Sequence, residues 1–201
     1  GCVHLGVENV RKVGAIGVPG WGWQCKIVDN ESGEEVKRGD AGILYVKGPG
    51  VMKEYYHDPK ATAEVLHDGW LDTGDVAMQD EEGFYYLVDR AKDVIVSGGE
   101  NLYPVQIEDF LRKNDKIHDV AVIGLPDRRL GEIAGAVIQI KEGMTCSEEE
   151  INEFCQDLPR YKRPRKIIFA PVPRNPTGKI EKPKLRKMYG EEHLVAFENK
   201  E

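Results

Sequence analysis

The chain has 201 residues, of which 40% are hydrophobic and 31% charged, with a formal net charge of −7. These values are typical of a globular protein, and the length allows one large domain or two small ones. The negative charge speaks against a general nucleic-acid binder, and no apolar run approaches the roughly 20 residues that a transmembrane helix needs.

The four cysteines follow no recognisable ligand or disulfide pattern. They are Cys2, Cys25, Cys146 and Cys155, and none forms a CxxC pair or has a histidine at a metal-like spacing. This usage predicts reduced thiols, a cytoplasmic location and no metal site in this chain. The opening residues, GCVHLGVENV, carry neither an initiator methionine nor a signal-peptide pattern, so we expect a piece of a longer protein.

The first ninety residues consist of short apolar or alternating runs separated by turn-forming clusters such as DNESGEE, GPG and DEEG. These runs predict strands over residues 14–18, 24–29, 42–47, 76–79 and 83–88. The dipeptide Asp58-Pro59 predicts a short helix over residues 57–66, because proline is tolerated at the first helical position. We therefore expect a β-barrel-like subdomain here.

Strands and helices alternate after residue 89. Apolar runs predict strands over residues 94–96, 120–125, 133–140 and 167–169. Helices are expected from Pro104, from Ser147 through about residue 157 with Glu150 completing a capping box, and over residues 182–188. The fold class is therefore α+β, with a small mixed α/β domain following the first subdomain. We place the boundary in the charged string DRAKD, which gives domains 1–89 and 90–201 with a junction near 89–93.

One segment is strongly basic. Residues 160–187 hold 11 lysines and arginines against a single acid, Glu181. Such a segment is either a solvated basic face or a surface that meets phosphates. Tyr161 and Phe169 are its only aromatic residues, which is too few for interleaved stacking on nucleic-acid bases.

The stretch VSGGENLYPVQIED, residues 96–109, places a glycine pair, Gly98 and Gly99, between an apolar strand and the helix expected from Pro104. Glycine adopts positive φ angles freely and leaves room for a close approach. The pair therefore either turns the strand into the helix or makes space for a ligand, and both demands can act together.

Three further stretches are weak signals singly and specific when taken in order. They are DGWLDTGD at residues 68–75, VDRAKDVIVSGGENLYPVQIE at 88–108 and RNPTGKIEK at 174–182. With GPGVMKEYYHDPKATAE, AVIGLPDRRLGE and YKRPRKIIF, they make the chain resemble the C-terminal portion of the adenylate-forming acyl-CoA synthetases. The resemblance runs from about Gly14 to Met188.

This resemblance implies an acid–thiol ligase that uses ATP, Mg²⁺ and coenzyme A. A carboxylic acid and ATP give an acyl-adenylate and pyrophosphate, and the thiol of coenzyme A then displaces AMP. The family has a large N-terminal domain and a small C-terminal lid that rotates between the two half-reactions. The chain would contain the last, barrel-like part of the large domain followed by the lid.

The resemblance also implies roles for particular residues. Asp75 matches the carboxylate that holds both ribose hydroxyls of the nucleotide, and Arg90 matches an arginine that also reaches the ribose. Lys92 matches the hinge at which the backbone rotates. Gly98 and Gly99 match the segment that lines the tunnel for the pantetheine arm of coenzyme A.

Lys179, in the PTGK stretch, matches the lysine that bridges the substrate carboxylate and the phosphate during adenylation. A compact ammonium on a flexible stem suits a site where negative charge accumulates. The same family segment is one in which the lysine is acetylated, so a lysine acetyltransferase and a deacetylase are expected partners at Lys179.

Two family motifs are absent from the chain: the Ser/Thr/Gly-rich phosphate loop and the aromatic-Gly-x-Thr-Glu stretch. We expect residues outside this chain to supply most contacts to ATP, Mg²⁺, coenzyme A and the acid, and the chain alone to be inactive. The SGGENLYP, YKRPR and PTGK forms resemble medium- or long-chain fatty-acyl ligases first and aryl or succinylbenzoate-type ligases second. A carrier-protein acceptor and a stand-alone, non-enzymatic binding module derived from the lid are the remaining alternatives.

Overall fold

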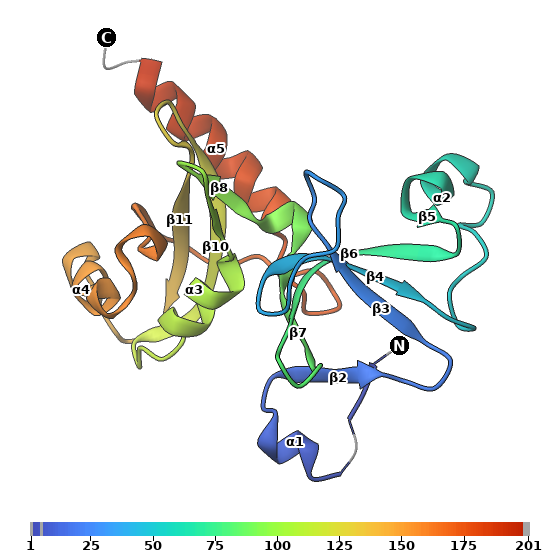
Figure 1. The fold of residues 1–201 in the computed structure, drawn as a ribbon. Helices are drawn as coiled ribbons and strands as arrows, with labels where there is room; N and C mark the ends of the chain where they lie inside the picture. The colour runs from blue at the N-terminus through green and yellow to red at the C-terminus, as the bar shows by residue number, and fades with distance from the viewer. Residues whose placement is uncertain (1, 5, 199–201) are drawn as a thin grey trace. The chain divides into compact units, whose positions relative to one another are not determined.

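The computed structural model describes residues 2–4 and 6–198. The chain forms two compact units, Gly1–Lys92 and Asp93–Glu201, which we call unit 1 and unit 2 (Figure 1). Within the described residues, no helix has the length and apolar character needed to cross a membrane.

Unit 1 is built on one antiparallel sheet of seven strands. The strands are β1 (Cys2–Val3), β2 (Ala15–Pro19), β3 (Gln24–Val28), β4 (Ala41–Lys47), β5 (Leu66–His67), β6 (Trp70–Gln79) and β7 (Tyr85–Arg90). Their order is β1-β2-β7-β6-β4-β3, with β5 paired to β6. Although β1 and β3 end this order, the Sγ atoms of Cys2 and Cys25 lie 3.8 Å apart. The sheet therefore curls until its edges meet, as expected for a barrel-like subdomain.

The helices of unit 1 are short. They are α1 (Glu8–Arg11) and α2 (Pro59–Val65). Helix α2 is shorter than the predicted 57–66, but Pro59 occupies its first turn as expected, and Asp58 caps it by accepting a hydrogen bond at Oδ1 from the backbone nitrogen of Ala61 at 2.9 Å. The core inside the curl contains Ile27, Leu44, Ala77 and Tyr85.

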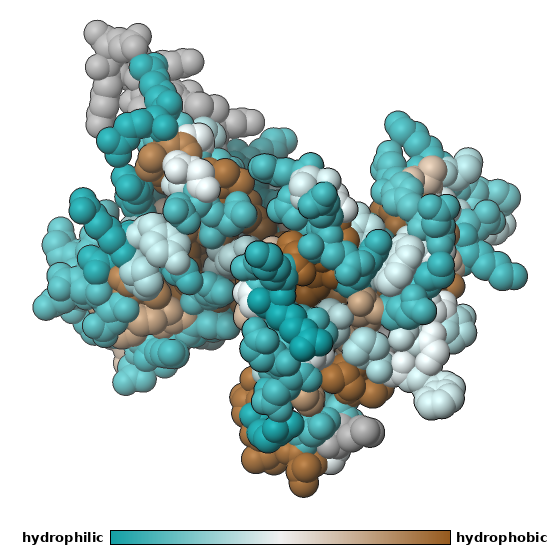
Figure 2. Space-filling view, viewed as in Figure 1, coloured by the Kyte–Doolittle hydropathy of each residue, from teal (hydrophilic) through white to brown (hydrophobic). Residues whose placement is uncertain are grey.

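An exposed apolar patch surrounds α1. Figure 2 shows hydrophobic residues gathered at the bottom of the view, where Figure 1 places α1. Val7, Val10 and Val13 each expose about four-fifths of their surface. Contiguous exposed apolar residues of this kind commonly mark a surface that packs against other protein.

Unit 2 contains a five-stranded sheet. Its strands are β8 (Ile95–Ser97), β9 (Glu100–Leu102), β10 (Ile117–Asp127), β11 (Gly131–Ile140) and β12 (Lys166–Phe169). The order is β10-β11-β8-β9, with β12 parallel to β11 and the other pairs antiparallel. Its α-helices are α3 (Pro104–Leu111), α4 (Glu148–Phe154) and α5 (Lys182–Glu198), and 3₁₀ turns span Ala91–Asp93 (at the junction of the units), Cys155–Asp157 and Arg160–Lys162.

Two hydrophobic cores lie on opposite faces of this sheet. Along β10, Val120 and Val122 join one core and Ala121, Ile123 and Leu125 join the other, because successive side chains of a strand point to opposite faces. Helices α3 and α4 contribute Ile107, Leu111 and Ile151 to the first core, and α5 contributes Leu185 to the second. The sheet is therefore covered on both faces (Figure 1).

The structure corrects several of the predicted boundaries. Ser147 caps α4 with Glu150 completing the capping box, as expected, but α4 proper ends at Phe154 and a 3₁₀ turn follows. Helix α5 runs to Glu198, well beyond the expected end at Met188. Strand β9 lies within the segment expected to lead directly into the Pro104 helix. Strand β6 begins at Trp70, so the TGD stretch lies inside a strand.

Candidate functional site

Asp75 and Arg90 occupy opposing positions on β6 and β7. Arg90 Nε lies 2.9 Å from Asp75 Oδ1, and Arg90 Nη1 donates to the carbonyl of Thr73 at 3.3 Å. Within the described chain, no hydrogen bond engages the second carboxylate oxygen, Oδ2, of Asp75. An ionised carboxylate is an acceptor only, so this oxygen suits a ligand hydroxyl.

A bulge in β6 sets the direction of Asp75. Register pairs join Ile43 to Val76 and Tyr45 to Asp72, so Thr73–Asp75 oppose the single residue Leu44. Gly74 takes a φ of +66°, and its backbone nitrogen donates to Asp72 Oδ1 at 2.8 Å. Extra residues in one strand re-aim side chains locally, which explains why the TGD stretch is both strand and turn in character.

Three neighbouring effects shift the pKa of the Asp75 carboxyl, and they do not all act in the same direction. Partial burial raises the pKa of the Asp75 carboxyl above its ordinary value, the nearby Arg90 guanidinium lowers it, and Asp72 raises it again. Burial outweighs the arginine, although the ion pair is short. The site therefore holds a carboxylate with incomplete charge compensation, which a hydroxyl donor would stabilise.

Lys92, the residue expected at the hinge, is the last residue of unit 1. It is exposed and lies in the 3₁₀ turn Ala91–Asp93. Asp93, which begins unit 2, is buried and accepts a hydrogen bond from Arg186 Nη2 at 2.7 Å. The chain on the unit 2 side of Lys92 is thus fastened to helix α5.

The glycine pair forms the two-residue turn of a β-hairpin between β8 and β9. Ser97 and Glu100 are register partners, and Gly98 and Gly99 have φ angles of +61° and +89°. Two consecutive positive φ angles are what a type I′ hairpin turn needs. The expectation that the pair turns the strand directly into the Pro104 helix is wrong, because β9 intervenes.

The two glycines have different surroundings. The backbone nitrogen of Gly98 donates to the carbonyl of Leu130 at 2.8 Å, and a Cβ atom on Gly98 would lie 3.0 Å from Leu130 Cδ2. A Cβ atom on Gly99 would meet nothing within 4 Å. Gly98 is therefore packed against the β10–β11 turn, whereas Gly99 faces open space.

Lys179 lies on a tight turn that its own residues organise. Asn175 Oδ1 accepts hydrogen bonds from the backbone nitrogens of Thr177 and Lys179 at 3.0 and 2.9 Å and from Thr177 Oγ1 at 2.7 Å. Across the turn, the backbone nitrogen of Asn175 donates to the carbonyl of Lys179 at 2.9 Å. Lys179 is exposed, and its ammonium has no ion-pair partner within residues 2–4 and 6–198.

Ion pairs on both sides of this turn connect it to strand β10 and helix α3 of the same unit. Arg174 forms two hydrogen bonds with Asp119 on β10, and Lys182 Nζ lies 2.8 Å from Glu108 Oε1 in a buried pair. Glu108 Oε1 also accepts from the backbone nitrogen of Val122, on the edge strand β10. Sequence reasoning missed these partners, because the residues in each ion pair are more than 50 positions apart.

The structure brings two of the predicted residues into contact in unit 1. Within unit 2 it places the glycine turn and the Lys179 turn apart. Asp75 and Arg90 are in direct contact. The glycine turn packs on Leu130, beside the β10–β11 turn, while the Lys179 turn is fastened to Asp119 near the start of β10. These two features therefore lie at opposite ends of β10.

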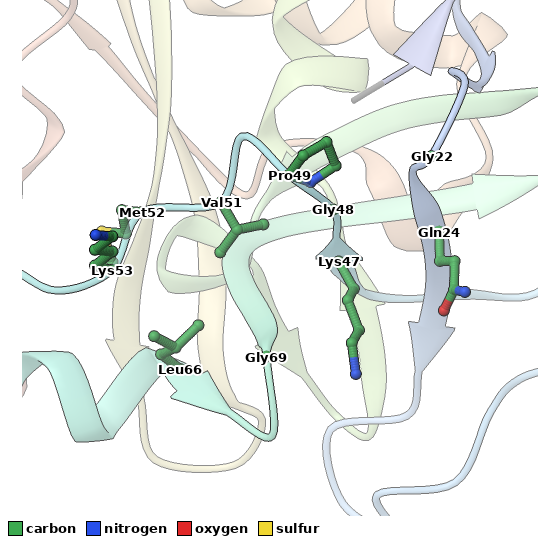
Figure 3. A pocket seen from close by; sticks show the side chains of 10 residues that line it. All are labelled: Gly22, Gln24, Lys47, Gly48, Pro49, Val51, Met52, Lys53, Leu66 and Gly69. Carbon is green, nitrogen blue, oxygen red and sulfur yellow. The ribbon is translucent and has the colours of Figure 1, made fainter.

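A separate pocket of about 450 Å³ lies in unit 1 (Figure 3). Gln24 and Lys47 are register partners on β3 and β4, and Val51 and Leu66 line its apolar side. Lys47 Nζ donates to the carbonyl of Asp68 at 2.9 Å, so its charge already serves the fold. No residue expected from the sequence to act in a site lines this pocket.

No metal centre is present in the part of the chain that the structure describes: no group of three or more His, Cys, Asp or Glu side chains could hold an ion.

Comparison with known families supports the reading of the motifs. The AMP-binding enzyme family matches residues 1–56, and the AMP-binding enzyme C-terminal domain family matches residues 106–179. The two matches fall in unit 1 and unit 2 respectively.

Curated relatives and solved structures point the same way. The chain is 46% identical to the long-chain-fatty-acid–CoA ligase FadD13 of Mycobacterium tuberculosis, over 76% of this chain and 32% of that protein. It is 41% identical to a feruloyl-CoA synthase of Amycolatopsis, over 90% of this chain and 37% of that protein. The chain spans about a third of the length of the curated relatives that it matches.

Among solved structures, the o-succinylbenzoate CoA synthetase of Bacillus subtilis superposes with a TM-score of 0.83 at 33% identity, covering 90% of this chain and 37% of that one. That enzyme is solved with its acyl-adenylate intermediate and also with ATP and a magnesium ion.

Proposed function

The chain belongs to the family of AMP-binding, adenylate-forming acyl-CoA synthetases, and we propose that it forms the C-terminal part of an ATP-dependent acyl-CoA ligase. The full protein would convert a carboxylic acid, ATP and coenzyme A into acyl-CoA, AMP and pyrophosphate. The observation that carries the proposal is the combination of the Asp75–Arg90 pair with an exposed Lys179 on a fastened turn, in a chain that matches both family parts.

In the first half-reaction, a carboxylate oxygen of the acid bonds to the α-phosphorus of ATP, and the bond to pyrophosphate breaks. Asp75 would accept hydrogen bonds from the ribose hydroxyls, with Arg90 holding the carboxylate in place. The Lys179 ammonium would balance the negative charge that accumulates as the two anions meet. Lys179 has no competing ion-pair partner among the described residues, which suits this role.

In the second half-reaction, the thiol sulfur of coenzyme A bonds to the acyl carbon, AMP leaves and the thiol proton is released. The lid would rotate about Lys92 between the two steps. The β8–β9 turn would then face the pantetheine arm, since Gly99 carries no side chain and has open space around it. Rotation at one short segment is consistent with a junction between units at Lys92 and Asp93.

The proposed substrate is a medium- or long-chain fatty acid, supported by the likeness to FadD13. An aryl acid or a succinylbenzoate-type acid is the second candidate, because the feruloyl-CoA synthase is almost as similar over more of the chain. Cytoplasmic location is part of the proposal, since the cysteine spacings match no secreted disulfide framework. The 201 residues alone should release no pyrophosphate, because they lack the phosphate loop.

Activity of the full-length protein tests the proposal. Purified protein with ATP, Mg²⁺ and coenzyme A should form octanoyl- or palmitoyl-CoA faster than feruloyl- or succinylbenzoyl-CoA, measured by chromatography of the thioesters. Faster use of the aryl acids would favour the second candidate. Acyl transfer to a carrier protein but not to coenzyme A would show that the thiol acceptor is a carrier protein and not coenzyme A. Absence of pyrophosphate release with every acid would point to the non-enzymatic binding module.

Acetylation of Lys179 belongs to the same proposal. An acetyl group removes the positive charge of the ammonium, so a lysine acetyltransferase would switch off adenylation and a deacetylase would restore it. Full adenylation activity of quantitatively Lys179-acetylated protein would dispose of this part.

A further inference from the structure

Arg174 connects the Lys179 turn to the sheet of unit 2 through three hydrogen bonds. Its Nε donates to Asp119 Oδ2 at 2.8 Å and its Nη2 to Asp119 Oδ1 at 2.9 Å, so the guanidinium fork pairs with both carboxylate oxygens. Its Nη1 donates to the carbonyl of Gly178 at 2.5 Å. The Arg174 side chain is therefore hydrogen-bonded both to strand β10 and to the residue next to Lys179.

The residues of the turn are held to one another by their own hydrogen bonds. Asn175 Oδ1, the backbone hydrogen bond from Asn175 to the carbonyl of Lys179 and that from Gly178 to the carbonyl of Asn175 fix its internal shape, and Arg174 pairs with Ile180 in an isolated β-bridge. These contacts hold the turn together but do not orient it on the sheet. The Arg174–Asp119 pair does so on the near side of the turn, because Asp119 belongs to the long strand β10, while the Lys182–Glu108 pair holds the chain on its far side.

The geometry suits orientation better than stabilisation. The Arg174 side chain is 43% exposed and that of Asp119 is 13% exposed, and ion pairs near the surface contribute little to folding. A two-bond fork between planar groups, in contrast, restricts direction closely. Burial raises the pKa of the Asp119 carboxyl, but the hydrogen bonds from Arg174 and from the backbone of Val120, together with the nearby arginine charges, outweigh burial and lower that pKa.

The position of the Lys179 ammonium depends on how precisely its backbone is held. Its four-carbon stem is flexible, so the position of the ammonium depends on where the backbone at Lys179 is held. A displacement of about 1 Å in a reacting group can cost about 100-fold in rate.

We propose that Arg174, held by Asp119, is a positioning residue that orients the Lys179 turn for the adenylation half-reaction. The proposal rests on the function proposed above. It assigns Arg174 no contact with substrate: the residue acts through the carbonyl of Gly178 and the backbone of the turn.

The test uses four forms of the full-length protein: wild type, Arg174→Gln, Asp119→Asn and the double variant. Each single variant should lower kcat for pyrophosphate release between about 10-fold and 100-fold. The KM for ATP should change less than threefold, and thioester formation from supplied acyl-adenylate should stay within twofold of wild type. The double variant should be no slower than the worse single variant, because both substitutions break one interaction.

Lys116→Ala is the matched control. Lys116 pairs with Glu150 on the surface of unit 2, with a similar exposure of 40%, and it does not contact the turn. It should leave both half-reactions unchanged. Arg174→Lys, which keeps the charge but loses the fork, should recover only part of the adenylation rate.

Hydrogen exchange separates this inference from the proposed function. In Arg174→Gln, the backbone amide of Lys179 should exchange at least about fivefold faster, while amides of α4 should not change. A wild-type protein that releases no pyrophosphate with any acid would overturn the proposed function. An active wild type with unchanged adenylation in Arg174→Gln, equal loss of both half-reactions, or unchanged exchange at Lys179 would overturn the positioning role.

Discussion

Arg90 Nε lies 2.9 Å from Asp75 Oδ1 across the pair of strands β6 and β7. The contact uses one carboxylate oxygen and leaves the other without a hydrogen-bond partner among the described residues. A β-bulge at Thr73–Asp75 turns the carboxylate to this position. The protein therefore carries an oriented carboxylate oxygen that can accept a hydrogen bond from a ligand hydroxyl.

Asp75→Asn in the full-length protein should raise the KM for ATP between about 10-fold and 100-fold. An amide offers one acceptor oxygen and no charge, and a hydrogen bond to a charged group contributes about 1.5–3 kcal/mol. Steady-state pyrophosphate release at varied ATP measures the effect. Asp40→Asn, at an exposed position in unit 1, is the control. An unchanged KM for Asp75→Asn would remove Asp75 from the nucleotide site.

Gly99→Asn and Gly99→Leu distinguish two reasons for a glycine in the hairpin turn: the positive φ angle that the turn needs and the open space that a pantetheine arm would need. Asparagine tolerates positive φ, whereas leucine does not, so a turn requirement alone would spare Gly99→Asn. If the turn also faces the pantetheine arm, both variants should slow thioester formation by at least about 10-fold while adenylation persists. Gly143→Asn, also at positive φ in open space, is the control. Normal coenzyme A turnover in Gly99→Leu would refute the tunnel role.

Lys92→Pro should block one of the two half-reactions. Proline locks its own φ and restricts the preceding residue, so the backbone could no longer adopt both lid poses. Single-turnover assays of adenylation and of thioester formation would show which pose is retained. Lys92→Ala, which keeps the torsional freedom, should be far less impaired than Lys92→Pro. Overall turnover at the wild-type rate in Lys92→Pro would contradict the hinge.

Cys2 should be the most reactive thiol near neutral pH. A hydrogen bond with Cys25 lowers the pKa of Cys2 to about 7, although burial opposes this, while burial raises the pKa of Cys155 to about 11. The thiolate is the nucleophile, so alkylation of Cys2 by iodoacetamide should rise with pH to a midpoint near 7. Peptide mass spectrometry gives the profile. Cys25→Ala should move the midpoint toward about 8.5, and a wild-type midpoint already there would contradict the assignment.

Local patterns predicted much of the fold. Strands β10 and β11 were identifiable as apolar runs because both faces of the sheet are buried, and Ser147 with Glu150 marked the start of α4. Helix α5 was predicted too short. Tyr189 packs on the second core, so tertiary packing continues beyond the predicted end at Met188, next to Gly190, a residue with low helix propensity.

The candidate site was less visible in the sequence. Asp75, Arg90, Lys92 and Lys179 stand in motifs, and the first two are in contact in the structure. The residues that hold the Lys179 turn were not predicted: Asp119 is 55 positions from Arg174, and Glu108 is 74 positions from Lys182. Strand β9 was also missed, because three residues before a proline give too short a pattern and only pairing with β8 defines them.

The most direct test of the account is the behaviour of Lys179→Ala in the two half-reactions of the full-length protein. We expect pyrophosphate release to fall by at least about 1,000-fold, because the variant would lose the charge that we propose to meet the reacting phosphate. Thioester formation from supplied acyl-adenylate should remain within about threefold of wild type, because Lys179 and the glycine turn lie at opposite ends of β10. Equal loss of both half-reactions, or adenylation at the wild-type rate, would contradict the assignment of Lys179.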